Sequence, residues 1–141
     1  MLLTLKEFNL KYPNCEIIGK GNAGIVYRSG NHAIKKQWWS TQSFFTEYCI
    51  LSQFQHPNIC SMEDIIFHAG YAYMSLPLGE TLFSAYYSKK ISLREIITDI
   101  FSGMNFLNER GIAHCDLKID NCIYHEGRVK IIDMGLSRFC E

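Results

Sequence analysis

The chain has 141 residues, 48% of them hydrophobic, which is enough to form one compact domain with its own core. Its 14 Lys and Arg residues balance 14 Asp and Glu residues, which argues against a nucleic-acid or anionic-membrane partner, because either would need a basic surface. No apolar run reaches the roughly 18 residues of a membrane-spanning helix, and the start lacks a signal peptide, so we expect an intracellular, cytoplasmic protein.

Five strands are expected in the first half of the chain. The first two flank a glycine-rich turn, and Ser29-Gly30-Asn31 forms a tight turn into the third. The expected strands are residues 16–19, 24–28, 32–37, 60–68 and 71–76.

One helix is expected between the third and fourth strands. Ser40, Thr41 or Ser43 can cap its first turn. The helix should end near Phe54, because Pro57 follows shortly and disfavours helical backbone before it.

The second half of the chain is mostly helical by the same criteria. A short helix is expected over residues 81–90, and Ser92 with Glu95 forms a capping box that opens a long helix ending near Gly111. A strand hairpin over residues 122–132 follows a loop. This order of elements predicts an α+β fold with two lobes.

The six cysteines show no Cys-x-x-Cys pair and no regular spacing. Without a secretory signal, we expect free thiols that mostly pack in the core. The alternative is a zinc site with four possible ligands, His114, Cys115, Cys122 and His125. Their spacing fits no common zinc finger.

Residues 19–26 read Gly-x-Gly-x-x-Gly-x-Val. Glycines let backbone N–H groups approach phosphate oxygens, because no Cβ stands in the way. A Rossmann turn shares this spacing but leads into a helix, whereas here a strand and a Ser-Gly-Asn turn follow. The segment therefore predicts a phosphate-covering β-hairpin.

A lysine and a glutamate are expected to pair near this hairpin. Lys35 shares one strand face with the small residue Ala33, whereas Lys36 points to the other face and is expected at the surface. On the next helix, Glu47 lies within an apolar stripe, where an unpaired carboxylate would be costly. Lys35 is its natural partner, and an exposed helix glutamate is the alternative. The stripe comprises Phe44, Tyr48, Leu51 and Phe54.

The most specific pattern lies near the end of the chain. Residues 114–121 read His-x-Asp-Leu-Lys-x-x-Asn, and Asp133-Met134-Gly135 follows across the hairpin. Together with the glycine-rich turn, Lys35 and Glu47, these are the five main motifs of protein kinases, in the right order. Over nearly its whole length, the chain resembles the eukaryotic-type serine/threonine protein kinase family. The resemblance implies a five-stranded N-lobe sheet with one helix, followed by the first, mostly helical part of a C-lobe.

The resemblance also implies ATP and Mg²⁺ as cofactors. Asp116 would accept the proton of the acceptor hydroxyl, and Lys118 would steady the γ-phosphoryl group. Lys35, placed by Glu47, would hold the α- and β-phosphates. The implied magnesium ligands are Asn121 and Asp133. The implied nucleotide-binding residues are Gly19, Gly21, Gly24, Val26, Ala33, Lys35, Met74, Ser75, Pro77 and Ile123.

Two residues of the pattern bear on substrate and mechanism. In the family, tyrosine kinases and small-molecule phosphotransferases usually lack a lysine at the position of Lys118, so a protein substrate with a Ser or Thr acceptor is implied. In the family, the position of His114 is a packing position, so the resemblance implies that His114 packs with Leu51 and Met134 between the lobes rather than acting as a catalytic base.

Three residues depart from the family's pattern. Cys115 replaces the arginine that pairs with a phosphorylated activation loop, which implies activity without that switch. Met134 replaces a phenylalanine, a change that flexible Met can accommodate. Pro77, third after the gatekeeper position Met74, has no N–H to donate to adenine, so weakened adenine binding is expected.

Length is a further departure. By the resemblance, we expect a partial kinase domain, with an N-lobe over residues 1–76 and a hinge and incomplete C-lobe over residues 77–141. The helix that would cover the apolar stripe of the 92–110 helix is expected to be missing. Part of this stripe should therefore face water and mediate self-association, bind a partner protein or pack within a longer polypeptide. The stripe comprises Ile96, Ile97, Ile100, Phe101, Met104 and Leu107.

Three functions remain open on the sequence. The leading one is ATP-dependent phosphoryl transfer to Ser/Thr hydroxyls of proteins, which the complete set of catalytic motifs favours. The rival is a non-catalytic nucleotide-binding or decoy module that acts through protein interaction, which the incomplete C-lobe favours. The third, a small-molecule kinase, is disfavoured by Lys118.

Overall fold

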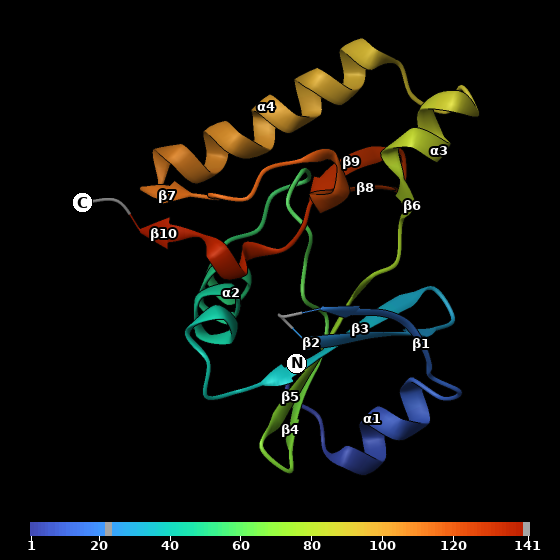
Figure 1. The fold of residues 1–141 in the computed structure, drawn as a ribbon, viewed down its shortest axis with the longest axis vertical. Coiled ribbons are helices and arrows are strands. Elements are labelled where there is room, and N and C mark those ends of the chain that lie inside the picture. The colour runs from blue at the N-terminus through green and yellow to red at the C-terminus, as the bar shows by residue number, and fades with distance from the viewer. Residues whose placement is uncertain (22–23, 140–141) are drawn as a thin grey trace.

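The computed structural model describes residues 1–21 and 24–139, and it confirms the α+β fold in two halves (Figure 1). One half is an antiparallel five-stranded sheet in the order β1-β2-β3-β5-β4. The strands are β1 (Glu16–Gly21), β2 (Gly24–Ser29), β3 (His32–Trp38), β4 (Ile65–His68) and β5 (Tyr71–Pro77). Asn22 and Ala23, at the tip of the glycine-rich turn, lie outside the described residues.

The other half is built around a long helix that lies over a small sheet (Figure 1). A three-stranded sheet pairs β8 with both β6 and β9, and a two-stranded sheet pairs β7 with β10. The helices are α3 (Leu82–Tyr87) and α4 (Leu93–Glu109), with the 3-10 turns η1 (Ile119–Asn121) and η2 (Met134–Leu136). The strands are β6 (Glu80–Thr81), β7 (Ile112–Ala113), β8 (Cys122–His125), β9 (Arg128–Ile131) and β10 (Arg138–Phe139).

The expectation of one helix beside the large sheet is wrong, because a helix α1 (Leu5–Lys11) precedes the sheet. Thr4 and Glu7 form a capping box at its start, with the Glu7 N–H donated to the Thr4 hydroxyl. Phe8 and Tyr12 are buried against the sheet, so packing as well as capping stabilises the helix. The expected second helix is α2 (Gln42–Gln53), and Thr41 is its cap.

The expected strand over residues 60–68 is also wrong in its first half. Only β4 pairs with β5 in a ladder, whereas the preceding residues find other partners. Cys60 donates its N–H to the Ile131 carbonyl at 3.0 Å, and Glu63 donates its N–H to the Ser75 carbonyl at 2.9 Å. This irregular segment therefore ties β9 of one half to β5 of the other.

Helix α4 approaches this connection closely at a glycine. A Cβ on Gly103 would lie 3.0 Å from both the Asn58 carbonyl oxygen and the Ile131 side chain. Asn58 is buried, and its side-chain amide donates to the Val129 carbonyl at 2.9 Å. The two halves consequently share one hydrophobic core.

The cysteine expectation holds in part. Cys60 and Cys122 are buried free thiols, and burial raises the pKa of the first to about 12 and of the second to about 11. Cys15 and Cys115 are exposed, so they are not core residues. Within residues 1–21 and 24–139, every helix is too short or too polar to cross a membrane.

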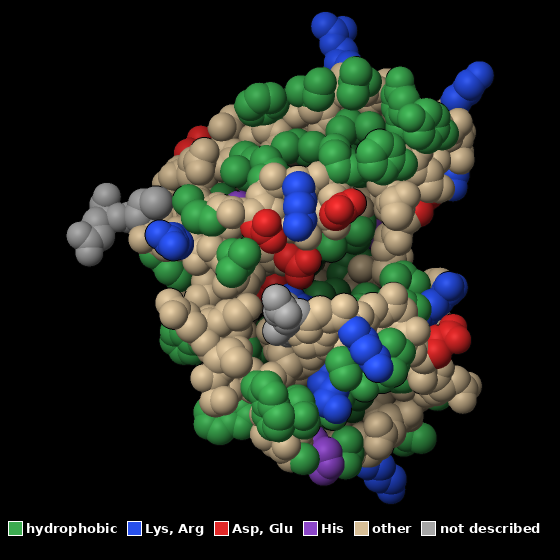
Figure 2. Space-filling model, viewed as in Figure 1, with side chains coloured by type: hydrophobic (Ala, Val, Ile, Leu, Met, Phe, Trp, Pro, Cys, Tyr) green, Lys and Arg blue, Asp and Glu red, His purple; other side chains and the backbone are tan. Residues whose placement is uncertain are grey.

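Helix α4 buries only part of its apolar stripe. Ile96 and Leu107 are buried, whereas Ile97 is 47% and Phe101 63% exposed. Apolar side chains also gather along the upper margin of the molecule in Figure 2. The expected exposure of part of this stripe is therefore present in the structure.

Candidate active site

The register of the large sheet places three predicted site residues side by side. Val26 lies opposite Lys35 in the β2–β3 ladder, and Lys35 lies opposite Met74 in the β3–β5 ladder. Residues directly opposite in antiparallel strands share a face, so the three side chains point to the same side of the sheet. Lys36 points to the other side, where its ammonium lies 4.1 Å from the centre of the Tyr71 ring.

Lys35 joins two carboxylates from distant segments. Its Nζ lies 2.9 Å from Glu47 Oε1 on α2 and 2.9 Å from Asp133 Oδ1 in the Asp-Met-Gly segment. Lys35 and Glu47 are both buried, so the predicted ion pair between them is confirmed. Glu47 Oε2 also accepts the Met134 backbone N–H at 2.8 Å. One buried glutamate thus fixes both the lysine and the backbone that carries Asp133.

The electrostatics of this cluster keep the lysine charged. Burial alone lowers the pKa of Lys35, but the carboxylates of Glu47 and Asp133 outweigh it and raise the pKa to about 12. Asp133 is about half exposed, so one side of the cluster faces solvent. A charged ammonium beside an accessible carboxylate can bind an anion and a cation at neighbouring positions.

A second cluster is built on the loop after β7. The Asn121 side-chain amide donates to Asp116 twice, to the carboxylate Oδ2 at 2.9 Å and to the backbone carbonyl at 2.7 Å. Lys118 Nζ lies 3.9 Å from Asp116 Oδ1 and remains mostly exposed. Because Asn121 turns its amide nitrogen toward Asp116, its Oδ1 is directed elsewhere and can act as a ligand.

Backbone and histidine contacts hold the two clusters together. Ile132, which precedes Asp133, donates its N–H to the Asn121 carbonyl at 2.8 Å. His114 is buried, with Nε2 2.9 Å from the Ile132 carbonyl oxygen and Nδ1 accepting the Asp116 N–H at 3.1 Å. Both ring nitrogens are therefore engaged, which agrees with a structural His114.

Two non-glycine residues of the site have left-handed backbone. Cys115 has φ 67° and Asp133 has φ 58°. Such conformations cost about 1–3 kcal/mol each and cluster at functional sites, where the surrounding structure enforces them. Figure 2 shows acidic side chains gathered beside a lysine or arginine at a hollow between the two halves of the molecule.

Three of the predicted nucleotide-binding residues, Ala33, Met74 and Ile123, lie on strands β3, β5 and β8. Ala33 and Leu76 are opposite each other in the β3–β5 ladder, two positions along from Lys35 and Met74. Ile123 lies on β8, and a Cβ on Gly79 would be 2.9 Å from it, so the connector runs closely over this strand. Met74 is fully buried.

The hinge offers few free backbone groups. Ser75 donates its N–H to the Asp64 carbonyl and accepts the Glu63 N–H, both at 2.9 Å. Pro77 has no N–H, and the Leu78 N–H is donated to the Asn31 carbonyl at 3.1 Å. The sequence revealed that Pro77 lacks an N–H, and the structure adds that the Leu78 N–H is already engaged.

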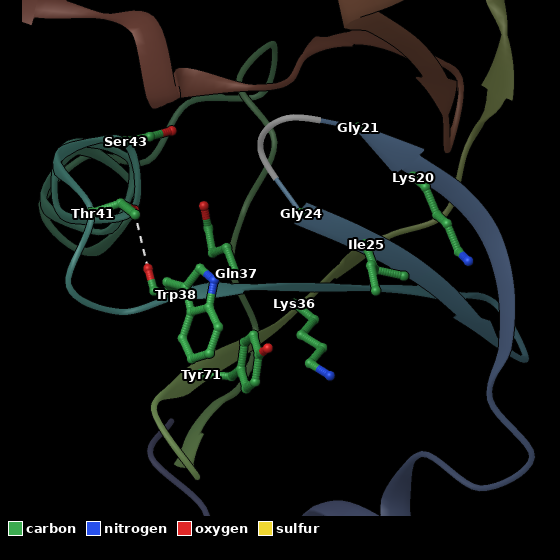
Figure 3. A pocket seen from close by; sticks show the side chains of 10 residues that line it. All are labelled: Lys20, Gly21, Gly24, Ile25, Lys36, Gln37, Trp38, Thr41, Ser43 and Tyr71. Atoms are coloured by element: carbon green, nitrogen blue, oxygen red, sulfur yellow. Dashed lines mark hydrogen bonds between the residues drawn. The ribbon is translucent and has the colours of Figure 1, made fainter.

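A separate cavity of about 400 Å³ lies beside the glycine-rich turn (Figure 3). Trp38 and Tyr71 stack in it with ring centres 3.8 Å apart, and Thr41 and Ser43 approach from α2. Of the predicted nucleotide-binding residues, only Gly21 and Gly24 line it. This cavity is therefore distinct from the Lys35 and Asp116 clusters.

The sequence signals for two contacts were incomplete. The backbone bond from Met134 to Glu47 has no side-chain signature and depends on the folded loop. The double engagement of Lys35 by Glu47 and Asp133 could be anticipated only from motif order. The zinc alternative finds no support in the structure. Among the described residues, no three His, Cys, Asp or Glu side chains are gathered to hold a metal ion.

Comparisons with known proteins agree with this geometry. A model of the protein kinase domain matches residues 12–141. Serine/threonine-protein kinase PRR2 of Saccharomyces cerevisiae is 36% identical over 101 residues, which cover 68% of this chain and 14% of that protein. Sperm motility kinase 1 of Mus musculus is 31% identical over 150 residues, which cover 94% of this chain and 31% of that protein. The chain thus spans less than a third of either relative, and it belongs to the eukaryotic-type protein kinase family.

Proposed function

We propose that this chain binds MgATP and transfers the γ-phosphoryl group to Ser or Thr hydroxyls of proteins. The observation that carries the proposal is the meeting of Lys35, Glu47 and Asp133, from three distant segments, beside the linked Asp116–Asn121 pair. Phosphoryl transfer needs mainly positioning and charge neutralisation. Two such clusters facing one hollow can supply both.

The proposed roles follow the chemistry of each group. Lys35 holds phosphate oxygens, and Glu47 keeps the lysine in place. Asp133 and Asn121 present a carboxylate and an amide oxygen, the hard oxygen ligands that Mg²⁺ prefers, and nucleotide phosphates and water would complete its coordination. Asp116 orients the acceptor hydroxyl and takes its proton, and exposed Lys118 lies beside it. Both relatives described above are named kinases, and one of them a serine/threonine-protein kinase.

A direct test is transfer of labelled phosphate from ATP to a generic basic protein. We expect label on Ser and Thr when Mg²⁺ is present, and none when it is chelated. Label on free small molecules but not on the protein would support a small-molecule kinase. Nucleotide binding without any transfer would support the rival non-catalytic module.

Asp133→Ala is expected to abolish the stabilisation of the protein by MgATP. The substitution removes the only carboxylate among the proposed magnesium ligands, so the nucleotide loses its bridge to the protein. Thermal denaturation with millimolar MgATP measures the effect. At about a hundred times Kd, the ligand would add about 2.7 kcal/mol to the wild-type stability. Equal shifts in wild type and variant would argue against Asp133 as a ligand.

We also propose that residues 1–76 form the nucleotide-covering lobe and that residues 77–141 contribute the catalytic loop. In addition, we propose that the exposed face of α4 makes protein contacts.

Ile97→Gln with Phe101→Gln should reduce self-association and apolar dye binding, because both side chains are exposed. Unfolding stability should change by less than about 0.5 kcal/mol. Ile96→Gln is the matched control, because Ile96 is buried and its loss should destabilise the protein. Sedimentation at micromolar concentration that is unaffected by the double substitution would contradict the proposal.

A further inference from the structure

A buried carboxylate lies outside the site described above. Asp64, just before β4, is only 1% exposed. Its side chain is hydrogen-bonded to the Tyr12 hydroxyl and accepts from Lys11 Nζ at 2.7 Å. Lys11 ends α1 and Tyr12 follows it, so this carboxylate anchors the C-terminal end of that helix.

The same carboxylate residue is bonded to the end of β5. The hydroxyl groups of Tyr12 and Ser75 lie 2.9 Å apart, and the Asp64 N–H is donated to the Ser75 hydroxyl at 2.9 Å. Ser75 in turn donates its own N–H to the Asp64 carbonyl. All three of these residues are buried, so the network is shielded from water.

Ser75 follows Met74, whose side chain lies on the same face of the sheet as Lys35. Successive residues of a strand point to opposite faces, so Met74 faces Lys35 while Ser75 faces α1. The network therefore holds β5 from the α1 face of the sheet, near the point where the strand becomes the hinge. Pro77, two residues after Ser75, has no N–H, and the Leu78 N–H is already donated to the Asn31 carbonyl. With neither N–H available for adenine, nucleotide binding depends more on the shape of this segment.

We propose that Tyr12, Asp64 and Ser75 form a latch through which α1 positions the end of β5 for nucleotide binding. Tyr12 is then a positioning residue that never touches the nucleotide. The inference rests on the proposed MgATP binding, and it adds an N-terminal element that controls the affinity. A change that detaches α1 would weaken nucleotide binding and leave the catalytic loop intact.

The electrostatics agree with a latch that is closed at neutral pH. Burial alone raises the pKa of Asp64, but hydrogen bonds from Lys11 and Tyr12 outweigh it and hold the pKa below its ordinary value. Burial and the Asp64 carboxylate raise the pKa of Tyr12 to about 12. Asp64 is thus ionised and Tyr12 keeps its proton, so the phenol can donate to the carboxylate.

Tyr12→Phe tests the latch, because it removes one hydroxyl and keeps the ring that packs against Phe8. We expect amide hydrogen exchange at Ser75 in the unliganded protein to become about three to ten times faster. The KM for ATP should rise about three-fold or more, with kcat unchanged. Ser75→Ala should likewise speed amide exchange at residue 75, and the double variant should add little to the exchange rate of either single one.

Tyr73→Phe is the matched control. Tyr73 lies two positions before Ser75 and packs against the same cluster as Phe8 and Tyr12, but within the described residues its hydroxyl has no hydrogen bond. It should leave exchange and KM unchanged. Unaltered exchange at Ser75 in Tyr12→Phe would overturn the latch whether or not ATP binds. Faster exchange without any MgATP binding by the wild type would instead overturn the proposed function and, with it, the latch's role in affinity.

Discussion

Replacing Lys35 with methionine is expected to lower the free energy of unfolding by about 3–5 kcal/mol and to abolish MgATP binding. Glu47 is buried, and among the described residues it would then keep only the Met134 N–H and a 3.5 Å contact from Gln37. Leaving a buried charge unpaired at that position costs far more stability than an ion pair on the surface of the chain contributes. The total free energy of unfolding of a domain of this size is about 5–15 kcal/mol, so a loss of this size should be clear in urea denaturation.

Two further variants separate the ion pair from general packing. Glu47→Gln should cost less than Lys35→Met, because Lys35 keeps Asp133 at 2.9 Å and the new amide oxygen can still accept from Met134. Combining the two substitutions should recover much of the stability lost in Lys35→Met, since no buried charge is then left alone. Lys36→Met is the control, and it should cost about 0.5–1 kcal/mol for the contact with Tyr71. Equal losses for Lys35 and Lys36 would contradict the role assigned to the buried pair.

The Lys35–Glu47 pair shows why part of the site could be predicted from the sequence. A glutamate inside an apolar helix stripe needs a cation, and alternation along a strand shows which lysine can face inward. Both rules depend only on local periodicity, and the structure contains the pair. The glycine-rich hairpin and the Ser92 cap of α4 are predictable for the same reason, because their signals lie within a few residues.

The latch and α1 show where this reasoning fails. The start of α1 has a local sequence signal in Thr4 and Glu7. The hydrogen-bond partners of Asp64, in contrast, are 11 to 53 residues away in sequence. A lone aspartate in a segment that reads as a strand gives no indication of burial. The same holds for the hinge, where the sequence revealed the missing N–H of Pro77 but not the engagement of Leu78 by Asn31. Contacts between distant segments depend on the final packing, which periodicity does not encode.

Asp116→Asn is expected to lower kcat for protein phosphorylation by about 10²–10⁴-fold, the usual contribution of a general base. Asparagine has the same shape but cannot accept the acceptor proton at neutral pH. Its amide oxygen can still receive the Asn121 amide, which lies 2.9 Å from Asp116 Oδ2. The backbone carbonyl of residue 116 keeps its own bond to Asn121, so the loop should retain its shape.

Binding and chemistry should therefore separate in this variant. The Kd for MgATP should stay within about two-fold of wild type, because Asp116 touches neither Lys35 nor Glu47 in the structure and the oxygen of Asn121 remains free to bind metal. Isothermal titration and single-turnover transfer to a basic protein measure the two quantities on the same sample. A parallel loss of MgATP affinity would show that Asp116 acts through Asn121 and the metal. Transfer at the wild-type rate would remove Asp116 from the mechanism and leave Lys35 and Asp133 as a nucleotide site without a base.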